Sequence, residues 1–374
     1  MKFQVALVTL LAFLAFTGAS SAQDINVDFG PTPVPSASYG AASGQVGAWN
    51  AIGVSPALVQ LVDVAGQPTS VFGGPTFSFS CDMYDCSACA GAVCAGFSGS
   101  ADDQALLGSW INADCGAGAT QLGFSGLESG RYAAYVYTYG CPSAPGVQTN
   151  LLVEGAYMGF DTTGVTFQGT WTGFPVGRHV FNLSSGSFTI SAIGVVEAGI
   201  AGLQLDKLDP VGVASCLGDG TGGNCPCANF GQPGEGCRNS ASTHGALLGA
   251  VGAPSMAFDT LGFQCASVPA GVAALLLQGD QMIAPIAFGD GLRCIGGHLK
   301  RLYLANASAS GALSLPPNIG FSVSARSAQL GDTLAPGSLR GYQLYYRDNS
   351  ASFCPAPQGS TYNISNAVEI SWQP

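Results

Sequence analysis

A short segment rich in cysteine and glycine constrains the fold of this chain most. Residues 216–237 read CLGDGTGGNCPCANFGQPGEGC and contain four cysteines and seven glycines. Glycine at this density disfavours both helices and regular strands, because each glycine loses much backbone freedom on folding. The segment therefore predicts a set of turns held together by disulfide bonds. We expect a second domain, residues 209–374, to open with it.

The first 22 residues have the pattern of a secretory signal peptide. Lys2 precedes an apolar run over 5–16, and the small residues Ser20, Ser21 and Ala22 form a cleavage site. The run is too short to span a bilayer. We expect cleavage after Ala22 and a protein that is secreted or held at the cell surface, without membrane insertion.

Composition favours strands over helices. Only 9% of residues are charged and 54 of 374 are glycine. Helical surfaces normally carry Lys, Glu and Arg, which are scarce here, whereas this composition suits strands and tight turns. The chain is therefore expected to be all-β.

Charge is unevenly distributed and limits the partners. Residues 23–208 carry 13 acidic and 3 basic side chains, and residues 209–374 carry 9 and 7. The net charge of −10 over residues 23–208 repels nucleic acid and other anionic polymers, so these partners are not expected. The acidic charge would tolerate bound calcium, although a need for solubility alone also explains this charge.

The 13 cysteines are expected to form disulfide bonds in an exported protein. Six lie in the first half and can close three bridges: Cys81, Cys86, Cys89, Cys94, Cys115 and Cys141. Six more are expected to pair in the second half: Cys216, Cys225, Cys227, Cys237, Cys294 and Cys354. Cys265, within the apolar run LGFQCASV, is the candidate for a buried free thiol.

The first half contains strand-like segments about ten residues apart with turn signals between them, which is typical of a β-sandwich or barrel. Residues 104–112 are the best helix candidate, with Asp102 and Asp103 as an acidic N-terminus. In RYAAYVYTY, Tyr135, Tyr137 and Tyr139 fall on one face of a strand. We interpret this stripe as packing.

Two resemblances add to this interpretation. The order INVDFG, GAWN, DDQALLGSW, FSGLESGRYAAYVY and AGIAGLQLDKL over residues 23–208 resembles a galactose-binding-like jelly roll, with a cysteine-rich insertion at 81–94. The motifs CLGDG…CPC, GQPGEGCRNS, DGLRCIGG, YQLYYRD and SNAVEISW resemble a C-terminal module of secreted proteins from planctomycete-type bacteria. The first resemblance implies a jelly-roll β-sandwich. The second implies export and a second, disulfide-stapled β-sandwich.

Catalytic signatures are not found in the sequence. No G-x-S-x-G motif occurs, and His179, His244 and His298 have no nucleophile motif with them. The C-x-x-C and C-x-C spacings at Cys86 and Cys225 fit disulfides better than zinc in an exported chain. We therefore expect a protein that is not an enzyme and has no cofactor beyond a possible structural calcium ion.

Candidate binding residues are few. Calcium would take oxygen ligands from Asp28 on the first strand and Asp206 on the last, if these two strands lie side by side. A sugar site needs an aromatic platform beside hydrogen-bonding groups. The candidates for it are Trp49, Asn50, Asp102, Asp103 and Trp171.

The expected function is binding of an extracellular glycan without catalysis. One alternative is a structural or adhesive protein of the cell surface that has no small ligand. Another is a hydrolase with an unrecognised site. The sequence leaves the oligomeric state and the identity of the ligand open.

Overall fold

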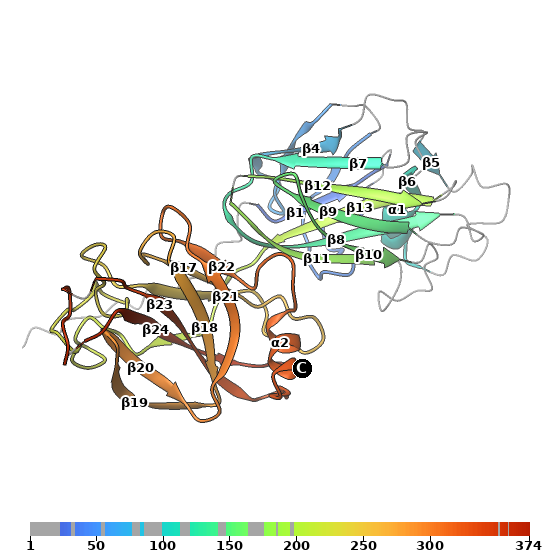
Figure 1. Cartoon of the computed structure of the whole chain (residues 1–374). Helices are drawn as coiled ribbons and strands as arrows, with labels where there is room; N and C mark the ends of the chain where they lie inside the picture. Colours follow the sequence, from blue (N-terminus) through green and yellow to red (C-terminus); the bar gives the residue numbers. More distant parts are fainter. Residues whose placement is uncertain are drawn as a thin grey trace, which may run out of the picture.

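The structure of the chain is a computed structural model. It describes residues 23–30, 34–53, 57–76, 83–85, 99–112, 120–140, 147–163, 176–184, 186–194, 198–350, 352–357 and 359–374. Two β-rich domains lie next to each other, and the chain passes from one to the other near residue 208 (Figure 1).

The first domain is a sandwich of two sheets. Its strands are β1 (Ile25–Asp28), β2 (Trp49–Ala51), β3 (Val59–Val62), β4 (Pro68–Pro75), β5 (Met83–Asp85), β6 (Ser109–Asn112), β7 (Thr120–Ser125), β8 (Gly130–Gly140), β9 (Val147–Val153), β10 (Ala156–Thr163), β11 (Val176–Leu183), β12 (Ser187–Gly194) and β13 (Ala198–Lys207), with the helix α1 (Ala101–Leu107). One sheet has the order β11-β8-β13-β1-β2, with β6 paired to β13 and β5 paired to β6. The other has the order β10-β9-β12-β7-β4-β3.

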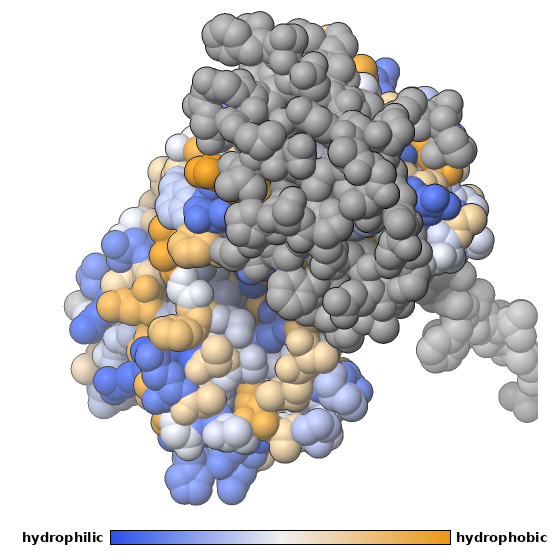
Figure 2. Space-filling model, turned by 90° about the vertical axis from the view of Figure 1, so that its right-hand side faces the viewer, coloured by the Kyte–Doolittle hydropathy of each residue, from blue (hydrophilic) through white to orange (hydrophobic). Residues whose placement is uncertain are grey.

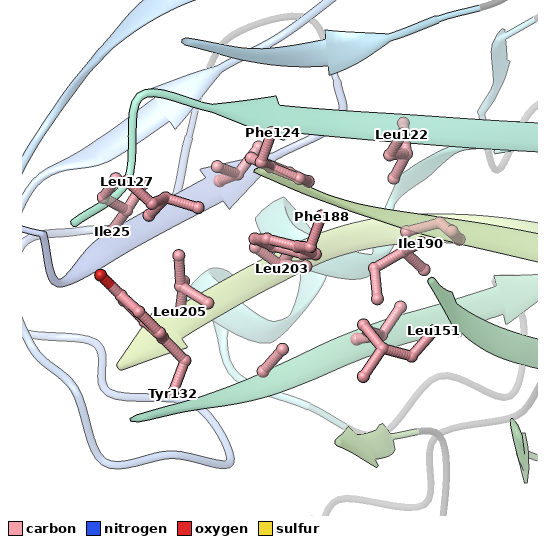
Figure 3. Packing of buried hydrophobic residues seen from close by; sticks show 14 of the residues in the cluster. Ile25, Leu122, Phe124, Leu127, Tyr132, Leu151, Phe188, Ile190, Leu203 and Leu205 are labelled. Atoms are coloured by element: carbon pink, nitrogen blue, oxygen red, sulfur yellow. The ribbon is translucent and has the colours of Figure 1, made fainter. Parts of the chain in front are cut away.

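Alternating apolar side chains from both sheets form the core of this sandwich (Figure 3). Phe188 stacks on Phe124 at 4.8 Å between ring centroids, and the ring centroid of Phe181 lies 5.0 Å from that of Phe188. Each large apolar side chain removed from water in this way contributes on the order of 1.5–3 kcal/mol. The period-two pattern therefore accounts for the two-layer architecture.

The tyrosine stripe on β8 faces away from this core. Tyr132, Ala134 and Val136 point inward, whereas Tyr137 and Tyr139 join a second apolar cluster on the outer face of the sheet. Residues of α1 and of the loop 34–42 cover that face. The stripe is packing, as the sequence predicted.

The helix differs from its predicted span. It runs from Ala101 to Leu107, with Ser100 as N-cap and Gly108 as C-cap. The following residues form β6, which pairs with β13. A Cβ on Gly108 would lie 2.4 Å from the carbonyl oxygen of Gln104. Pairing with β13 thus determines the conformation of residues 109–112, which the local pattern had assigned to the helix.

The second domain is also all-β. Its strands are β14 (Pro210–Val211), β15 (Val213–Ser215), β16 (Leu247–Val251), β17 (Gly262–Ala266), β18 (Ala273–Gly279), β19 (Gln281–Phe288), β20 (Gly291–Gly296), β21 (Lys300–Asn306), β22 (Leu313–Leu315), β23 (Leu339–Arg347) and β24 (Tyr362–Ser371), with the helix α2 (Val323–Gln329). Sheets β14-β16-β17-β22 and β15-β24-β23-β18-β21 enclose a core that includes Trp372, and β19-β20 forms a separate hairpin. The predicted all-β sandwich architecture is confirmed.

Three disulfide bonds staple the second domain. They join Cys216 to Cys294, Cys225 to Cys237, and Cys227 to Cys354. Residues 216–237 form turns and no strand. Cys265 is a buried free thiol whose pKa is raised by burial. All six cysteines of the first half lie outside the described residues.

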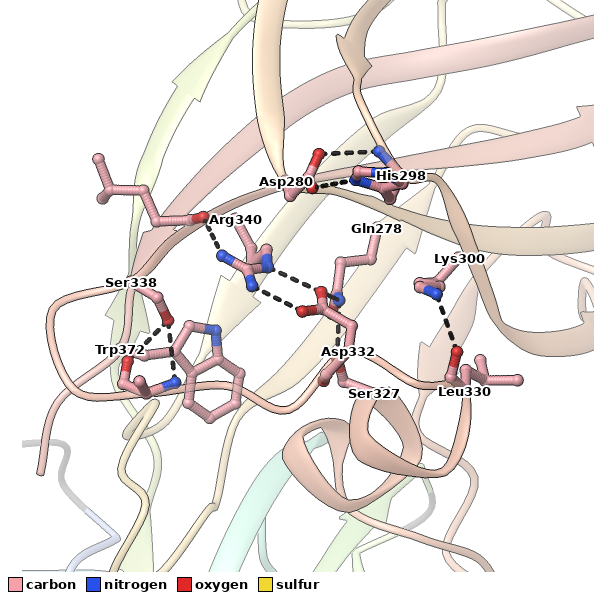
Figure 4. A network of polar contacts seen from close by, with 12 residues as sticks. Gln278, Asp280, His298, Lys300, Ser327, Leu330, Asp332, Ser338, Arg340 and Trp372 are labelled. Atoms are coloured by element: carbon pink, nitrogen blue, oxygen red, sulfur yellow. Dashed lines mark hydrogen bonds and ion pairs between the residues drawn. The ribbon is translucent and has the colours of Figure 1, made fainter.

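A polar network ties the end of α2 to the sheet (Figure 4). Arg340 donates from Nε and Nη2 to the two carboxylate oxygens of Asp332, at 2.8 and 2.7 Å. Gln278 Nε2 donates to Asp332 and to Ser327 Oγ, both at 2.7 Å. The hydrogen bond from Arg340 lowers the pKa of Asp332. These contacts hold the loop after α2 in place.

The two domains meet through a polar contact. Arg131, which is 4% exposed, donates to the carbonyl of Thr260 at 2.9 Å and to Asn182 Oδ1 at 3.1 Å. The side-chain amide of Asn318 accepts a hydrogen bond from the N–H of Asn182 and donates one to the Asn182 carbonyl. Phe258 packs edge-on against Tyr135 at 5.7 Å. Within the described residues, no strand of the first domain pairs with a strand of the second.

The outer surface mixes residue types. On the end of the molecule drawn in Figure 2, hydrophobic and hydrophilic residues are interspersed over the described part. Neither α1 nor α2 is long and apolar enough to cross a membrane, and these are the helices of the described residues.

Candidate functional site

Trp49 and Asn50 have structural contacts on β2. Trp49 is 8% exposed and lies in the apolar cluster on the outer face of the seven-stranded sheet, with its ring centroid 6.1 Å from that of Tyr39. The Asn50 amide donates to the carbonyls of Asn26 and Val62, both at 2.9 Å, and accepts from the N–H of Val62 at 2.8 Å. This amide therefore links β2 to the neighbouring chain segments.

Asp102 and Asp103 are also engaged within the protein. Both lie in the first turn of α1. Asp102 accepts hydrogen bonds from the N–H and hydroxyl of Ser36, at 2.6 and 2.8 Å. Asp103 accepts from Tyr39 Oη and from the N–H of Ser100. The two carboxylates thus hold the loop 34–45 against the helix.

The remaining tryptophans divide between core and undescribed segments. Trp171, the other sugar-site candidate, lies outside the described residues. Trp110 is fully buried and packs edge-on against Tyr139 at 5.6 Å.

The structure does not bring Asp28 and Asp206 together. Strands β1 and β13 do lie side by side, but they are antiparallel, so Asp28 is opposite Gly202 and the start of β1 is opposite the end of β13. Asp206 is four residues further along than Gly202, roughly 14 Å at about 3.4 Å per residue. The described residues contain no group of three or more His, Cys, Asp or Glu side chains that could hold a metal ion.

The two carboxyl groups differ in environment. Asp28 is fully buried, neither of its oxygens has a hydrogen-bond partner, and burial raises its pKa to about 8. Burial and the nearby Asp24 and Asp209 raise the pKa of Asp206 to about 6. Each position therefore favours the protonated carboxyl more than water does.

The three histidines occupy unrelated places. His179 is buried between the sheets with Nε2 3.1 Å from Thr149 Oγ1, and burial lowers its pKa to about 4. His244 Nδ1 lies 2.8 Å from Glu235, and His298 Nδ1 lies 2.8 Å from Asp280. The histidines are therefore not gathered in one site.

A different pair of aromatic residues is exposed on the outer face of the six-stranded sheet. Tyr157 is 50% exposed and Phe160 is 61% exposed, both on the edge strand β10. Tyr157 is opposite Leu152 and Phe160 is opposite Asn150 on β9. Leu152 and Asn150 are two residues apart, so the two rings share one face.

The exposure of this pair does not follow from the regular strand pattern of the sequence. Tyr157 and Phe160 are three residues apart, which in a regular strand puts them on opposite faces. A bulge between Tyr157 and Gly159 shifts the register by one residue and turns both rings outward. The signal available in the sequence was the glycine at 159, a residue that often marks a bulge.

Neutral polar groups lie beside these rings. The outward positions of the next two strands, β9 and β12, hold Gln148, Asn150, Leu152, Thr189, Ser191 and Ile193. Gln148 Nε2 donates to Asn150 Oδ1 at 2.7 Å. Neither VQTNLLV of β9 nor SFTISAIG of β12 contains a charged residue. This face, defined as the β10 face (Gln148, Tyr157, Phe160, Thr189 and Ile193), combines exposed rings with uncharged amide and hydroxyl groups.

Comparisons with known proteins give only distant structural likenesses. No family model and no curated protein matches the sequence. Among solved structures, the chain is similar to a family 35 carbohydrate binding module from Clostridium thermocellum, with 19% identity over 26% of this chain and 76% of that one and a TM-score of 0.20. It is also similar to a carbohydrate binding module of Cellvibrio mixtus lichenase 5A in complex with cellotriose. That match has 19% identity, covers 26% of this chain and 70% of the module, and has a TM-score of 0.17.

A third likeness covers more of the chain. The tandem CBM22 domains of Paenibacillus barcinonensis Xyn10C match 80% of this chain and 93% of their own length, at 10% identity and a TM-score of 0.22. TM-scores of this size do not carry a functional assignment. The case for a function therefore rests on the residues of the chain itself.

Proposed function

We propose that this chain is an exported glycan-binding protein without catalytic activity, and that its first domain binds the glycan on the β10 face. The observation that carries the proposal is the exposure of Tyr157 and Phe160 on the same face of the six-stranded sheet. Exposed aromatic rings provide apolar surfaces on which the faces of sugar rings can pack, and neighbouring amides and hydroxyls fix their orientation.

Charge supports a neutral glycan on this face. β9 and β12 carry no charged residue, and the first half of the chain is strongly acidic. An acidic sugar would find no basic partner in these strands and would be repelled by the surrounding charge. A neutral polysaccharide avoids this cost.

Export is part of the same proposal. The signal-peptide pattern of residues 1–22 and the three disulfide bonds of the second domain support it, because structural disulfides persist in oxidising compartments. The second domain then acts as an accessory module.

The test uses the mature full-length chain. An array of neutral and acidic glycans is expected to identify a neutral ligand, and calorimetry then measures its affinity for the Tyr157→Ala and Phe160→Ala variants. Loss of one stacking ring costs about 1–3 kcal/mol by analogy with aromatic stacking on bases, which is roughly ten- to a hundredfold in Kd. The melting temperature should not change, because both side chains are exposed.

Phe321→Ala provides the matched control. Phe321 is 53% exposed and lies in the second domain, so the control removes a ring of similar exposure away from the β10 face. If the parent protein binds no glycan, the structural or adhesive alternative replaces this proposal. Release of reducing sugars from a bound glycan would instead favour the hydrolase alternative.

A further inference from the structure

The five-stranded sheet of the second domain has one covered face and one that is only partly covered. One face packs on the main core through Leu276, Leu344 and Tyr346. On the other, the hairpin β19-β20 lies against β23 and β24 and encloses the cluster around Cys216 and Cys294 (Figure 1). Towards the edge strand β21, the same face reaches solvent.

Three side chains in one row follow this face across the strands. Leu304 on β21 is opposite Leu275 on β18, which is opposite Tyr345 on β23. Leu275 and Tyr345 are partly buried against the cluster around Cys216, whereas Leu304 is 73% exposed. The row thus runs from the hairpin out to solvent. The name open face is used for this row together with Phe288, Arg293, Arg301, Arg347 and Tyr362.

Three aromatic rings contact one another at the inner end of the open face. The centroids of Phe288 and Tyr362 are 5.2 Å apart, those of Tyr345 and Tyr362 are 5.4 Å apart, and those of Phe288 and Tyr345 are 6.2 Å apart. All three residues are half-buried. Three half-buried rings in mutual contact leave ring surface available to a ligand.

One arginine contacts these rings, and two more lie on the same face of the sheet. The Arg293 guanidinium carbon lies 5.4 Å from the centroid of Phe288, and Arg293 Nε is buried without a hydrogen-bond partner. Arg347 is opposite Tyr362, and Arg301 is opposite Leu277, whose side chain belongs to the same cluster. Directly opposed residues point to the same side of a sheet, and both Arg301 and Arg347 are exposed.

This concentration of positive charge is unusual for the chain. The whole protein carries 11 basic and 22 acidic residues, and three of the seven basic residues after Asp209 lie on the open face. The nearest acidic residue along the hairpin, Asp290, is fully buried and accepts a hydrogen bond from the N–H of Ser360. The exposed Arg301 and Arg347 therefore place positive charge on this face of a chain whose net charge is negative.

We propose that the open face is a second binding site, and that it takes a polysaccharide bearing carboxylate groups. Guanidinium groups bind carboxylates with two parallel hydrogen bonds, and Phe288, Tyr345 and Tyr362 offer ring surface to the sugars between them. The repulsion of anionic polymers expected from the sequence comes from residues 23–208, with 13 acidic and 3 basic side chains, whereas residues 209–374, which contain the open face, carry 9 and 7. This site is independent of the β10 face and of any ligand bound there.

The experiment compares two polymers with one backbone. Binding of the full-length chain to polygalacturonate and to its methyl ester is measured by calorimetry at low ionic strength. Polygalacturonate is expected to bind and the uncharged ester to bind at least tenfold more weakly. The Arg301→Gln, Arg347→Gln double variant should lose at least tenfold in affinity for polygalacturonate. The affinity of the corresponding double lysine variant should lie between those of the parent and the glutamine variant, because lysine keeps the charge but not the paired hydrogen bonds.

Arg326→Gln is the matched control. Arg326 lies on α2 and donates to the carbonyl of Leu302, a residue of the main core, so this variant removes one charge from the opposite side of the sheet. Equal affinity for the ester, or equal weakening by Arg326→Gln, would overturn the proposal. Tighter binding of an oligothymidylate than of polygalacturonate would overturn it in favour of single-stranded nucleic acid.

Discussion

At the scale of single residues, Asp28 is the group whose burial has the clearest consequence. Neither oxygen has a partner, and burial raises the pKa to about 8. An unfolded aspartate titrates near 3.9. Between these two values the folded protein keeps a proton that the unfolded chain releases, so stability falls as the pH rises from about 4 to about 8.

Asp28→Asn is expected to remove this pH dependence. One proton accounts for at most about 1.4 kcal/mol per pH unit. The effect of Asp28 is best measured between pH 7 and 8. Asp206 and Asp290, with raised pKa values of about 6, and His179, with a lowered pKa of about 4, change the stability mainly below pH 7. Urea unfolding at pH 7.0, 7.5 and 8.0 should show that the free energy of unfolding of the parent falls with pH and that the free energy of the variant changes less. An equal dependence on pH in the two proteins would show that Asp28 is already ionised.

At the scale of elements, α1 depends on a reciprocal cap. Ser100 accepts from the N–H of Asp103 at 3.1 Å, and Asp103 accepts from the N–H of Ser100 at 2.7 Å. This arrangement satisfies backbone groups at both ends of the first turn. Since α1 spans only two turns and covers Trp49 and Trp110, its position depends on this cap and on the packing beneath it.

Removal of either partner of the cap should destabilise the protein. We expect Ser100→Ala to cost about 1 kcal/mol and Asp103→Ala somewhat more, because Asp103 also accepts from Tyr39. The double variant should cost less than the sum of the two, since each single variant already breaks the shared contact. Guanidinium unfolding of the four proteins measures this coupling, and strictly additive losses would argue against a reciprocal cap.

At the scale of the whole molecule, the polar interface couples two separate cores. Each domain has its own apolar core, so each half is expected to fold when it is expressed alone under oxidising conditions. In the full chain, Asn182 exchanges hydrogen bonds with the second domain on both its backbone and its side chain. The interface should therefore make the two domains unfold together.

Asn182→Ala tests this coupling. The variant loses its side-chain hydrogen bonds to Arg131 and to the carbonyl of Pro316, and it leaves Arg131, which is 4% exposed, with one partner fewer. We expect a loss of roughly 1–3 kcal/mol and a broader or split calorimetric transition. Asn349→Ala, at an exposed position, serves as the control. An unchanged single transition would mean that the domains are coupled by other contacts.

Local patterns were enough to predict several properties. Low charge and high glycine content indicated an all-β chain, the period of two in RYAAYVYTY separated core-facing from outward side chains, and the glycine density of 216–237 indicated turns. The apolar run around Cys265 pointed to a buried thiol, which the structure leaves unpaired. Each of these properties depends on residues close together in the chain, so the sequence alone determined them.

Only the tertiary structure decided which residues reach solvent and which meet. Trp49 became core because α1 and the loop 34–42 cover it, whereas a bulge turned Phe160 outward. Antiparallel pairing separated Asp28 from Asp206, and a fold over more than 100 residues brought Cys227 to Cys354. These outcomes depend on register and on contacts between distant segments, which no local pattern contains, because a shift of one residue exchanges the two faces of a strand.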